Sequence, residues 1–161
     1  MLNLELKEMR ILLNYLDVFT VYPEDFDRRI NAGNFHDVRD KKFIEMFSGD
    51  VSSEYQVSPV LVSFSGKGFI DTKFLIEHMR KIEGRNFRPA TIEEILAFRR
   101  FNQEKPKKYS IHLIDENPPI ECRYKVPSII RTGEDQYELV CLDYPVGQSH
   151  GREVLFVEVV V

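Results

Sequence analysis

The sequence predicts a single α+β domain, in which a helical N-terminal part and two central helices pack on a mainly antiparallel C-terminal sheet. Apolar residues recur every three or four positions near the start of the chain, and strand-like runs dominate after residue 108. Between these parts, two segments carry helix-start signals. A chain of 161 residues is long enough to bury one core without disulfides or metals. We therefore expect one domain over residues 1–161, with a helical element over 1–50 and the remaining elements over 56–161.

The first fifty residues predict three helices. An apolar stripe with spacings of three and four predicts an amphipathic helix over residues 3–19, formed by Leu2, Leu6, Met9, Leu13 and Leu16. Pro23, followed by two acids, suits the first turn of a second helix, which Gly33 would end. A third helix is expected to begin near Asn34 or Asp37 and to stop at Gly49.

The centre of the chain predicts an isolated strand and then two helices. The stretch "QVSPVLVSFS" alternates as a strand does, and Pro59 should lie at its start or on a sheet edge because proline has no amide hydrogen to donate. Asp71 can cap the first helix. Thr91 and Glu94 have the spacing of a capping box, in which each side chain accepts a hydrogen bond from the other's backbone amide, and they predict the start of the second helix.

The last third of the chain predicts an antiparallel meander. The strand-like runs are "KYSIHLI", "IECRYKV", "SIIR", "YELVCLDY" and "EVLFVEVVV", with short turns at "DENPP" and "TGED". The final run is almost wholly apolar, which favours a central strand. Cys122 and Cys141 fall in such runs, so we expect buried thiols rather than metal ligands.

One segment is basic although the protein carries a net charge of −4. Residues 80–108 hold nine basic and four acidic side chains, a balance of +5. The candidate binding residues in this segment are Arg85, Arg88, Arg99 and Arg100, since arginine holds phosphates and carboxylates through paired donors. An acidic protein partner suits such a segment. Nucleic acid suits it less well, because the overall acidity opposes nonspecific binding to a polyanion.

A second candidate surface is the loop "YPVGQSHGRE", residues 144–153, with Ser149, His150 and Arg152. Ser149 and His150 are neighbours in sequence, whereas the fold brings the nucleophile and base of a catalytic triad together, so their adjacency is no catalytic signal. His112 lies in a strand-like run beside Asp115 and Glu116, where we expect a cross-strand polar contact, with a role as general acid or base as the alternative. The four histidines are too scattered to predict a metal site, and no motif predicts a cofactor.

No apolar run is long enough to cross a bilayer, and the N-terminal residues lack the pattern of a signal peptide. We therefore expect no membrane association and a soluble, cytoplasmic protein.

The run "RPATIEEILAF", residues 88–98, resembles an "RPAT-x-EE-L-L-A-F" segment that recurs in small uncharacterised bacterial or phage-like proteins. The resemblance covers the central and C-terminal parts of the chain. It implies no activity, because none is attached to those proteins.

The leading hypothesis is a noncatalytic binding or regulatory module that engages a protein partner, since no catalytic motif matches and charge is segregated along the chain. One alternative is a small enzyme acting on nucleic acid or a nucleotide, with Arg88, Arg99 or Arg100 holding phosphate and His112 or His150 as base. A further alternative is a structural protein that forms homo-oligomers through the N-terminal helix. The sequence leaves open whether the protein is an enzyme.

Overall fold

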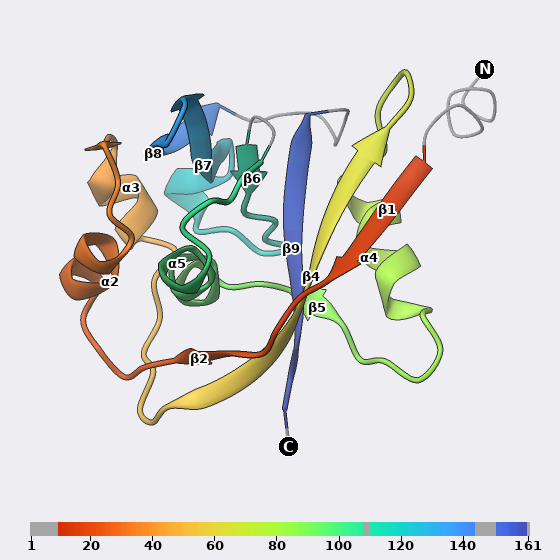
Figure 1. Ribbon diagram of the computed structural model, residues 1–161, viewed down its shortest axis with the longest axis horizontal. Helices are drawn as coiled ribbons and strands as arrows, with labels where there is room; N and C mark the ends of the chain where they lie inside the picture. Colours follow the sequence, from red (N-terminus) through yellow and green to blue (C-terminus); the bar gives the residue numbers. More distant parts are fainter. Residues whose placement is uncertain (1–9, 108–109, 144–150, 161) are drawn as a thin grey trace.

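The computed structural model describes residues 10–107, 110–143 and 151–160, which form a mixed sheet flanked by helices (Figure 1). The elements in chain order are β1 (Arg10–Tyr15), β2 (Phe19–Val21), α2 (Phe26–Ala32), β3 (Asp37–Val38), α3 (Lys41–Glu45), β4 (Tyr55–Ser65), α4 (Thr72–Arg80), β5 (Arg88–Pro89), α5 (Ile92–Phe101), β6 (Ser110–His112), the 3-10 turn η1 (Ile120–Cys122), β7 (Lys125–Gly133), β8 (Gln136–Asp143) and β9 (Arg152–Val159). In the described residues the sheet has nine strands, in the order β1-β4-β9-β6-β7-β8-β3, while β2 pairs with β4 and β5 with β9.

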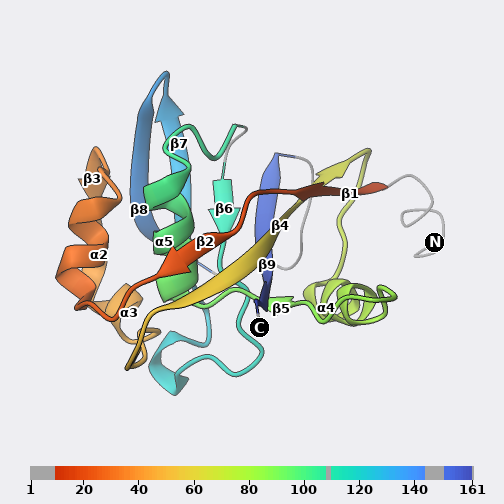
Figure 2. The ribbon, with the colours of Figure 1, turned by 60° about the horizontal axis from the view of Figure 1, so that its bottom comes forward.

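Helices cover both faces of the sheet (Figure 2). On one face α2, α3 and α5 enclose the larger core, to which Phe98 of α5 and Leu61 of β4 belong. On the other face α4 packs against a second core, to which Met79 and Val62 belong. Because neighbouring residues of a strand point to opposite faces, β4 contributes to both cores.

The predicted fold class is wrong, because the described N-terminal residues contribute strands to the sheet rather than a helical part. The predicted helix over 3–19 is contradicted where the structure describes it, since residues 10–15 and 19–21 pair with β4. Ile11 and Leu13 pack against the second core while Leu12 is exposed, which is the alternation of a strand. A short run of leucines fits a helix or a strand equally well, and pairing with β4 decides between them.

The predicted third helix is also wrong over its first part. Residues 37 and 38 form β3, parallel to β8, and the flanking backbone amides of His36 and Arg39 donate to Tyr137 O (2.7 Å) and Leu139 O (2.9 Å). Asp40 has a φ of 59°, a left-handed conformation that interrupts a helix. Only Lys41–Glu45 is helical, as α3.

The local helix signals later in the chain are confirmed. Gly33 ends α2, and Asp71 caps α4 by accepting hydrogen bonds from the amides of Lys73 and Phe74. The predicted start of α2 is wrong, because the helix begins at Phe26 with Asp25 as its cap, and Pro23 lies before its first turn. Thr91 and Glu94 form the predicted capping box at the start of α5.

The strand that contains Pro59 is neither isolated nor on an edge. β4 pairs with β9 on one side and with β1 and β2 on the other, and Pro59 is its fifth residue. The backbone N and O of one strand residue point to the same side. Pro59 O accepts from the Leu16 amide (3.3 Å), so its nitrogen faces the break between β1 and β2. The missing amide hydrogen therefore falls where the pairing of β4 passes from β1 to β2.

The C-terminal strands are not a simple meander. β6 is antiparallel to β7 but parallel to β9, and η1 occupies the start of the predicted strand "IECRYKV". The central position of β9 is confirmed, because it lies between β4 and β6. Among the described helices, none is long and apolar enough to span a bilayer.

Candidate binding groove

A buried ionic cluster fixes the segment that leads into α5. The Arg88 guanidinium donates to both Glu94 carboxylate oxygens at 2.7 and 2.8 Å, and Tyr55 Oη donates to Glu94 Oε2 at 2.9 Å. Glu94 is fully buried. Burial opposes its ionisation, but hydrogen bonds from Arg88 and the Thr91 amide outweigh burial and lower the pKa of the carboxyl. Burial and the Glu94 carboxylate together raise the pKa of Tyr55.

Three open hollows adjoin one another beside this cluster and meet at Asp115, which lines all three. The largest, about 440 Å³, extends from Arg88 and Thr91 to the loop after β6. The second, about 430 Å³, lies between α4 and residues 115–117. The third, about 100 Å³, lies between Phe47 and the start of β7. We call these three hollows together the Asp115 groove.

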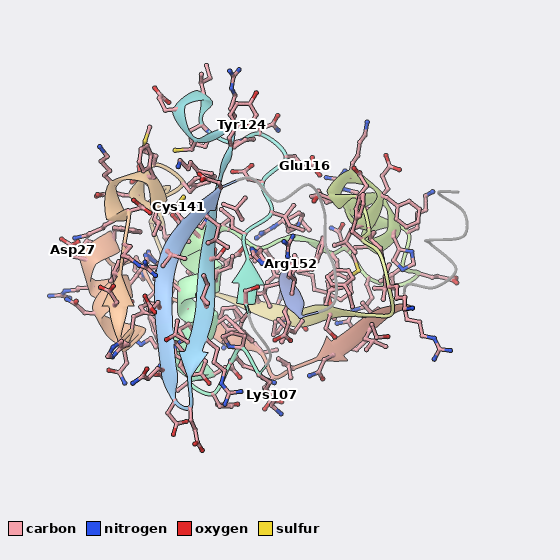
Figure 3. All side chains as sticks on the ribbon, turned by 90° about the horizontal axis from the view of Figure 1, so that it is seen from above. Asp27, Lys107, Glu116, Tyr124, Cys141 and Arg152 are labelled. Atoms are coloured by element: carbon pink, nitrogen blue, oxygen red, sulfur yellow. The ribbon has the colours of Figure 1, made fainter. Side chains whose placement is uncertain are left out.

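The groove is built from segments that are far apart in the sequence. Its walls come from the end of α3, the start of α5, α4 and the segment between β6 and β7, which all lie along one side of the molecule (Figure 2). Glu116 and Tyr124 mark the β6–β7 segment in Figure 3. Glu93 accepts a hydrogen bond from the Gly49 amide, which ties the turn after α3 to α5.

Large apolar side chains are exposed beside the groove. Ile120 is 83% exposed, Tyr124 61%, Phe74 44% and Met46 40%. Met46 lies next to η1, because its Sδ atom is 3.6 Å from Cys122 Sγ. Isolated exposed apolar residues are normal on a protein surface, whereas apolar residues gathered around a concavity are typical of a contact surface.

Three of the basic side chains that line the groove, Arg80, Arg88 and Lys125, are already in ion pairs. Arg80 forms an ion pair with Glu116, and Lys125 pairs with Asp143 at 2.8 Å. Arg123 lines the smallest hollow, with its guanidinium 4.8 Å from the centre of the Tyr124 ring. In the described part of the chain, Arg123 has no carboxylate partner within ion-pair distance.

The four arginines that the sequence singled out do not converge. Arg88 lines the groove. Arg85 pairs with Glu158 at 2.8 Å and lies 5.0 Å from the ring centres of Tyr15 and Phe87, and Arg100 pairs with Glu24 at 2.7 Å. Arg99 is buried and donates to backbone oxygens of Gly33 (2.9 Å) and Lys105 (3.2 Å). The excess of five positive charges in residues 80–108 is thus largely matched by carboxylates from elsewhere in the chain.

The second predicted surface is only partly visible. Ser149 and His150 lie outside the described residues. Arg152 is the first residue of β9, on the strand next to β6, and it lines none of the three hollows.

His112 belongs to a buried polar network, and its contact with Ser128 of β7 is a cross-strand polar contact of the kind that the sequence predicts. Its Nε2 atom is 2.6 Å from Ser110 Oγ and its Nδ1 atom is 2.9 Å from Ser128 Oγ. Ser128 donates to Val126 O at 3.0 Å, so it accepts from Nδ1–H, and Nε2 accepts from Ser110. Burial, together with the nearby Arg152 charge, lowers the pKa of His112 to about 4. The ring is neutral at pH 7, and none of the three residues lines the groove.

The described residues contain no cluster of three or more histidine, cysteine or acidic side chains arranged to hold a metal ion. Cys122 and Cys141 are both buried free thiols. Burial raises the pKa of both, that of Cys141 to about 11, which keeps them protonated and unreactive at neutral pH.

Comparison with known proteins found no matching family model, no matching curated protein and no matching solved structure. The resemblance of residues 88–98 to the recurring bacterial or phage-like segment stays a prediction.

Proposed function

We propose that this protein is a noncatalytic binding module that engages a segment of a protein partner in the Asp115 groove. The observation that carries the proposal is that three adjoining hollows share the Asp115 carboxylate in their lining, on segments that also expose large apolar side chains. Adjoining hollows suit an extended peptide or loop, which can place successive side chains in successive hollows, and the exposed apolar side chains on the same segments offer further contacts.

The charges favour a partner segment with an acidic residue near η1. Arg123 lines the hollow at that end and lacks a carboxylate partner among the described residues, whereas Arg80 and Lys125 are paired. A carboxylate on the partner would pair with Arg123 at the edge of the contact, where charges contribute to specificity and association rate. This keeps the expectation of an acidic partner but moves its contact from Arg85, Arg99 and Arg100 to Arg123.

Nucleic acid is the less favoured ligand. Binding to a polyanion needs several unpaired basic groups on one surface, and carboxylates pair with Arg85, Arg88 and Arg100. His112 does not line the groove, so the enzyme alternative loses this residue as a base at the two largest hollows.

A display library of random linear peptides tests the proposal with a defined probe. Selected peptides should shift the backbone amide resonances of residues that line the groove, including Asp115 and Ile92. Ile120→Asp adds a charge to a side chain that is 83% exposed, so it leaves the fold intact and should weaken binding about tenfold or more.

Val18→Asp is the matched control, because Val18 is 47% exposed on the connection between β1 and β2, and no residue of that connection lines a hollow. Ile120, by contrast, lies between Pro118 and Arg123, which both line the smallest hollow. The proposal fails if the selected peptides map outside the groove, or if Ile120→Asp and Val18→Asp weaken binding equally.

A further inference from the structure

The sheet has one long edge that no described strand covers. β1 pairs with β4 through six residues on one side, while its other side pairs with no described strand (Figure 1). At the opposite end of the sheet β3 has only two residues, which is a common way of protecting an edge. β1 has little of the usual protection, because the stretch "RILLNY" contains no proline, no lysine and no bulge, and its one charged side chain, Arg10, stands at its start.

The hydrogen bonds of the neighbouring turn show which backbone groups face outward. The Leu16 amide donates to Pro59 O, so Leu16 points its backbone groups toward β4. Along an antiparallel pair, successive residues point their backbone N–H and C=O groups alternately toward the partner strand and away from it. Leu12 and Asn14 therefore also point toward β4, and the N–H and C=O groups of Ile11, Leu13 and Tyr15 point to the open edge.

We infer that β1 pairs antiparallel with β1 of a second copy of this chain, joining two sheets across a two-fold axis. In the register centred on Leu12, the outward groups of Ile11 meet those of the second copy's Leu13, and the two Leu12 side chains lie opposite each other. Arg10 then lies opposite Asn14 of the second copy, so no like charges face each other.

The side-chain pattern supports this occupant and this register. Directly opposite residues share a face of the sheet, so Ile11 and Leu13 extend the apolar row that already packs on the second core. Leu12 is 44% exposed and gains the Leu12 side chain of the second copy as an apolar neighbour. Centring the pair on Leu13 instead would place Leu12 opposite Asn14 and lose that match. A strand that is apolar opposite itself suits a second copy of the chain as its partner.

The inferred contact is separate from the Asp115 groove, because no residue of β1 lines the groove. It replaces the hypothesis of self-association through an N-terminal helix with pairing through a strand. A six-residue strand pair is smaller than the standard interface, so we expect a concentration-dependent dimer.

Sedimentation of the full chain over a concentration series tests the inference. The average mass should rise toward twice the 19.0 kDa of one chain as the concentration approaches about 1 mM. Leu12→Lys places two like charges opposite each other and should weaken the dimer about tenfold. Leu13→Pro removes an amide that faces the open edge while sparing the bonds to β4, and should also weaken it. Val18→Lys is the control and should leave the mass unchanged, because Val18 is 47% exposed and lies outside β1.

Cysteine cross-linking tests the register even if the dimer is weak. In an antiparallel pair, directly opposite Cβ atoms are about 5 Å apart, close enough for a disulfide after small adjustments. Leu12→Cys should give a disulfide-linked dimer under mild oxidation, whereas Val18→Cys should not, and the native thiols of Cys122 and Cys141 are buried. The inference is overturned if the chain stays monomeric at every concentration without a Leu12→Cys cross-link. It is equally overturned if a dimer forms that Leu12→Lys does not weaken.

Discussion

Acidification should destabilise this fold through His112, and the size of the effect follows from the burial of the ring. The pKa of His112 is lowered from the ordinary 6.5 to about 4, first by burial and then by the Arg152 charge on the adjacent strand. Between these two values the unfolded chain binds a proton that the folded chain excludes. The contribution of neutral His112 to stability is therefore fully present above about pH 6.5 and is lost as the pH falls toward 4.

The magnitude comes from the difference between the two pKa values. Each pH unit in this window is worth about 1.4 kcal/mol, so the whole contribution is at most about 3 kcal/mol. The ring is 2% exposed, and both of its nitrogens are already engaged by Ser110 and Ser128. A proton added at Nε2 would therefore face the hydroxyl hydrogen of Ser110, so two donors would meet unless the hydroxyl rotates.

Urea unfolding at a series of pH values, on the wild type and on His112→Asn, measures this contribution. The variant should be less stable at pH 7, because Ser110 loses its partner and the smaller side chain leaves a cavity. It also lacks the titrating ring, so its disadvantage should shrink by up to about 3 kcal/mol between about pH 7 and pH 4. Both proteins contain the same carboxylates, so the effect of carboxylate titration on stability cancels in this difference. If the two stability curves run parallel down to about pH 4.5, His112 is not held neutral by the fold and the reasoning is refuted.

Two further predictions concern the start of α5, and both are measured by urea unfolding at neutral pH. Thr91→Ala should lower the free energy of unfolding by about 1 kcal/mol, because it removes the cap of the Glu94 amide. Thr72→Ala is the control and should lower it less, because Asp71 supplies the cap of α4. Equal losses of stability in the two variants would contradict the capping role of Thr91. Arg88→Met should cost about 2 kcal/mol by leaving the buried Glu94 carboxylate without its main partner. In a Glu94→Gln background, Arg88→Met should lower the free energy of unfolding by less than about 1 kcal/mol. If the two substitutions lower it additively instead, the two side chains do not interact.

The elements that could be predicted from the sequence are those with signals within a few residues. The caps of α4 and α5 are of this kind, because Asp71, Thr91 and Glu94 bond to amides two or three residues away. β1 and β3 could not be predicted in this way. β1 becomes a strand by pairing with residues about fifty positions later, and β3 pairs with residues about a hundred positions later. An apolar run near the start of the chain carries no local sign of those partners.

The candidate site shows the same limit in its charges. A basic run predicts a binding surface only if its side chains face the same way and lack partners. Arg85 and Arg100 meet carboxylates more than seventy positions away, at Glu158 and Glu24. The Asp115 groove is likewise assembled from four separate segments, and no single stretch of sequence indicates it.

The pairing of these arginines changes what a charge substitution would report. Reversing Arg85 or Arg100 breaks an ion pair within the fold, so reduced binding by such a variant could reflect reduced stability alone. Arg123 has no carboxylate partner among the described residues, so its reversal removes no intramolecular ion pair. A loss of peptide binding by Arg123→Glu at unchanged unfolding free energy would therefore report the contact itself. For this reason Arg123 is the basic side chain to substitute at the η1 end of the groove, and it lies outside the basic segment that the sequence indicated.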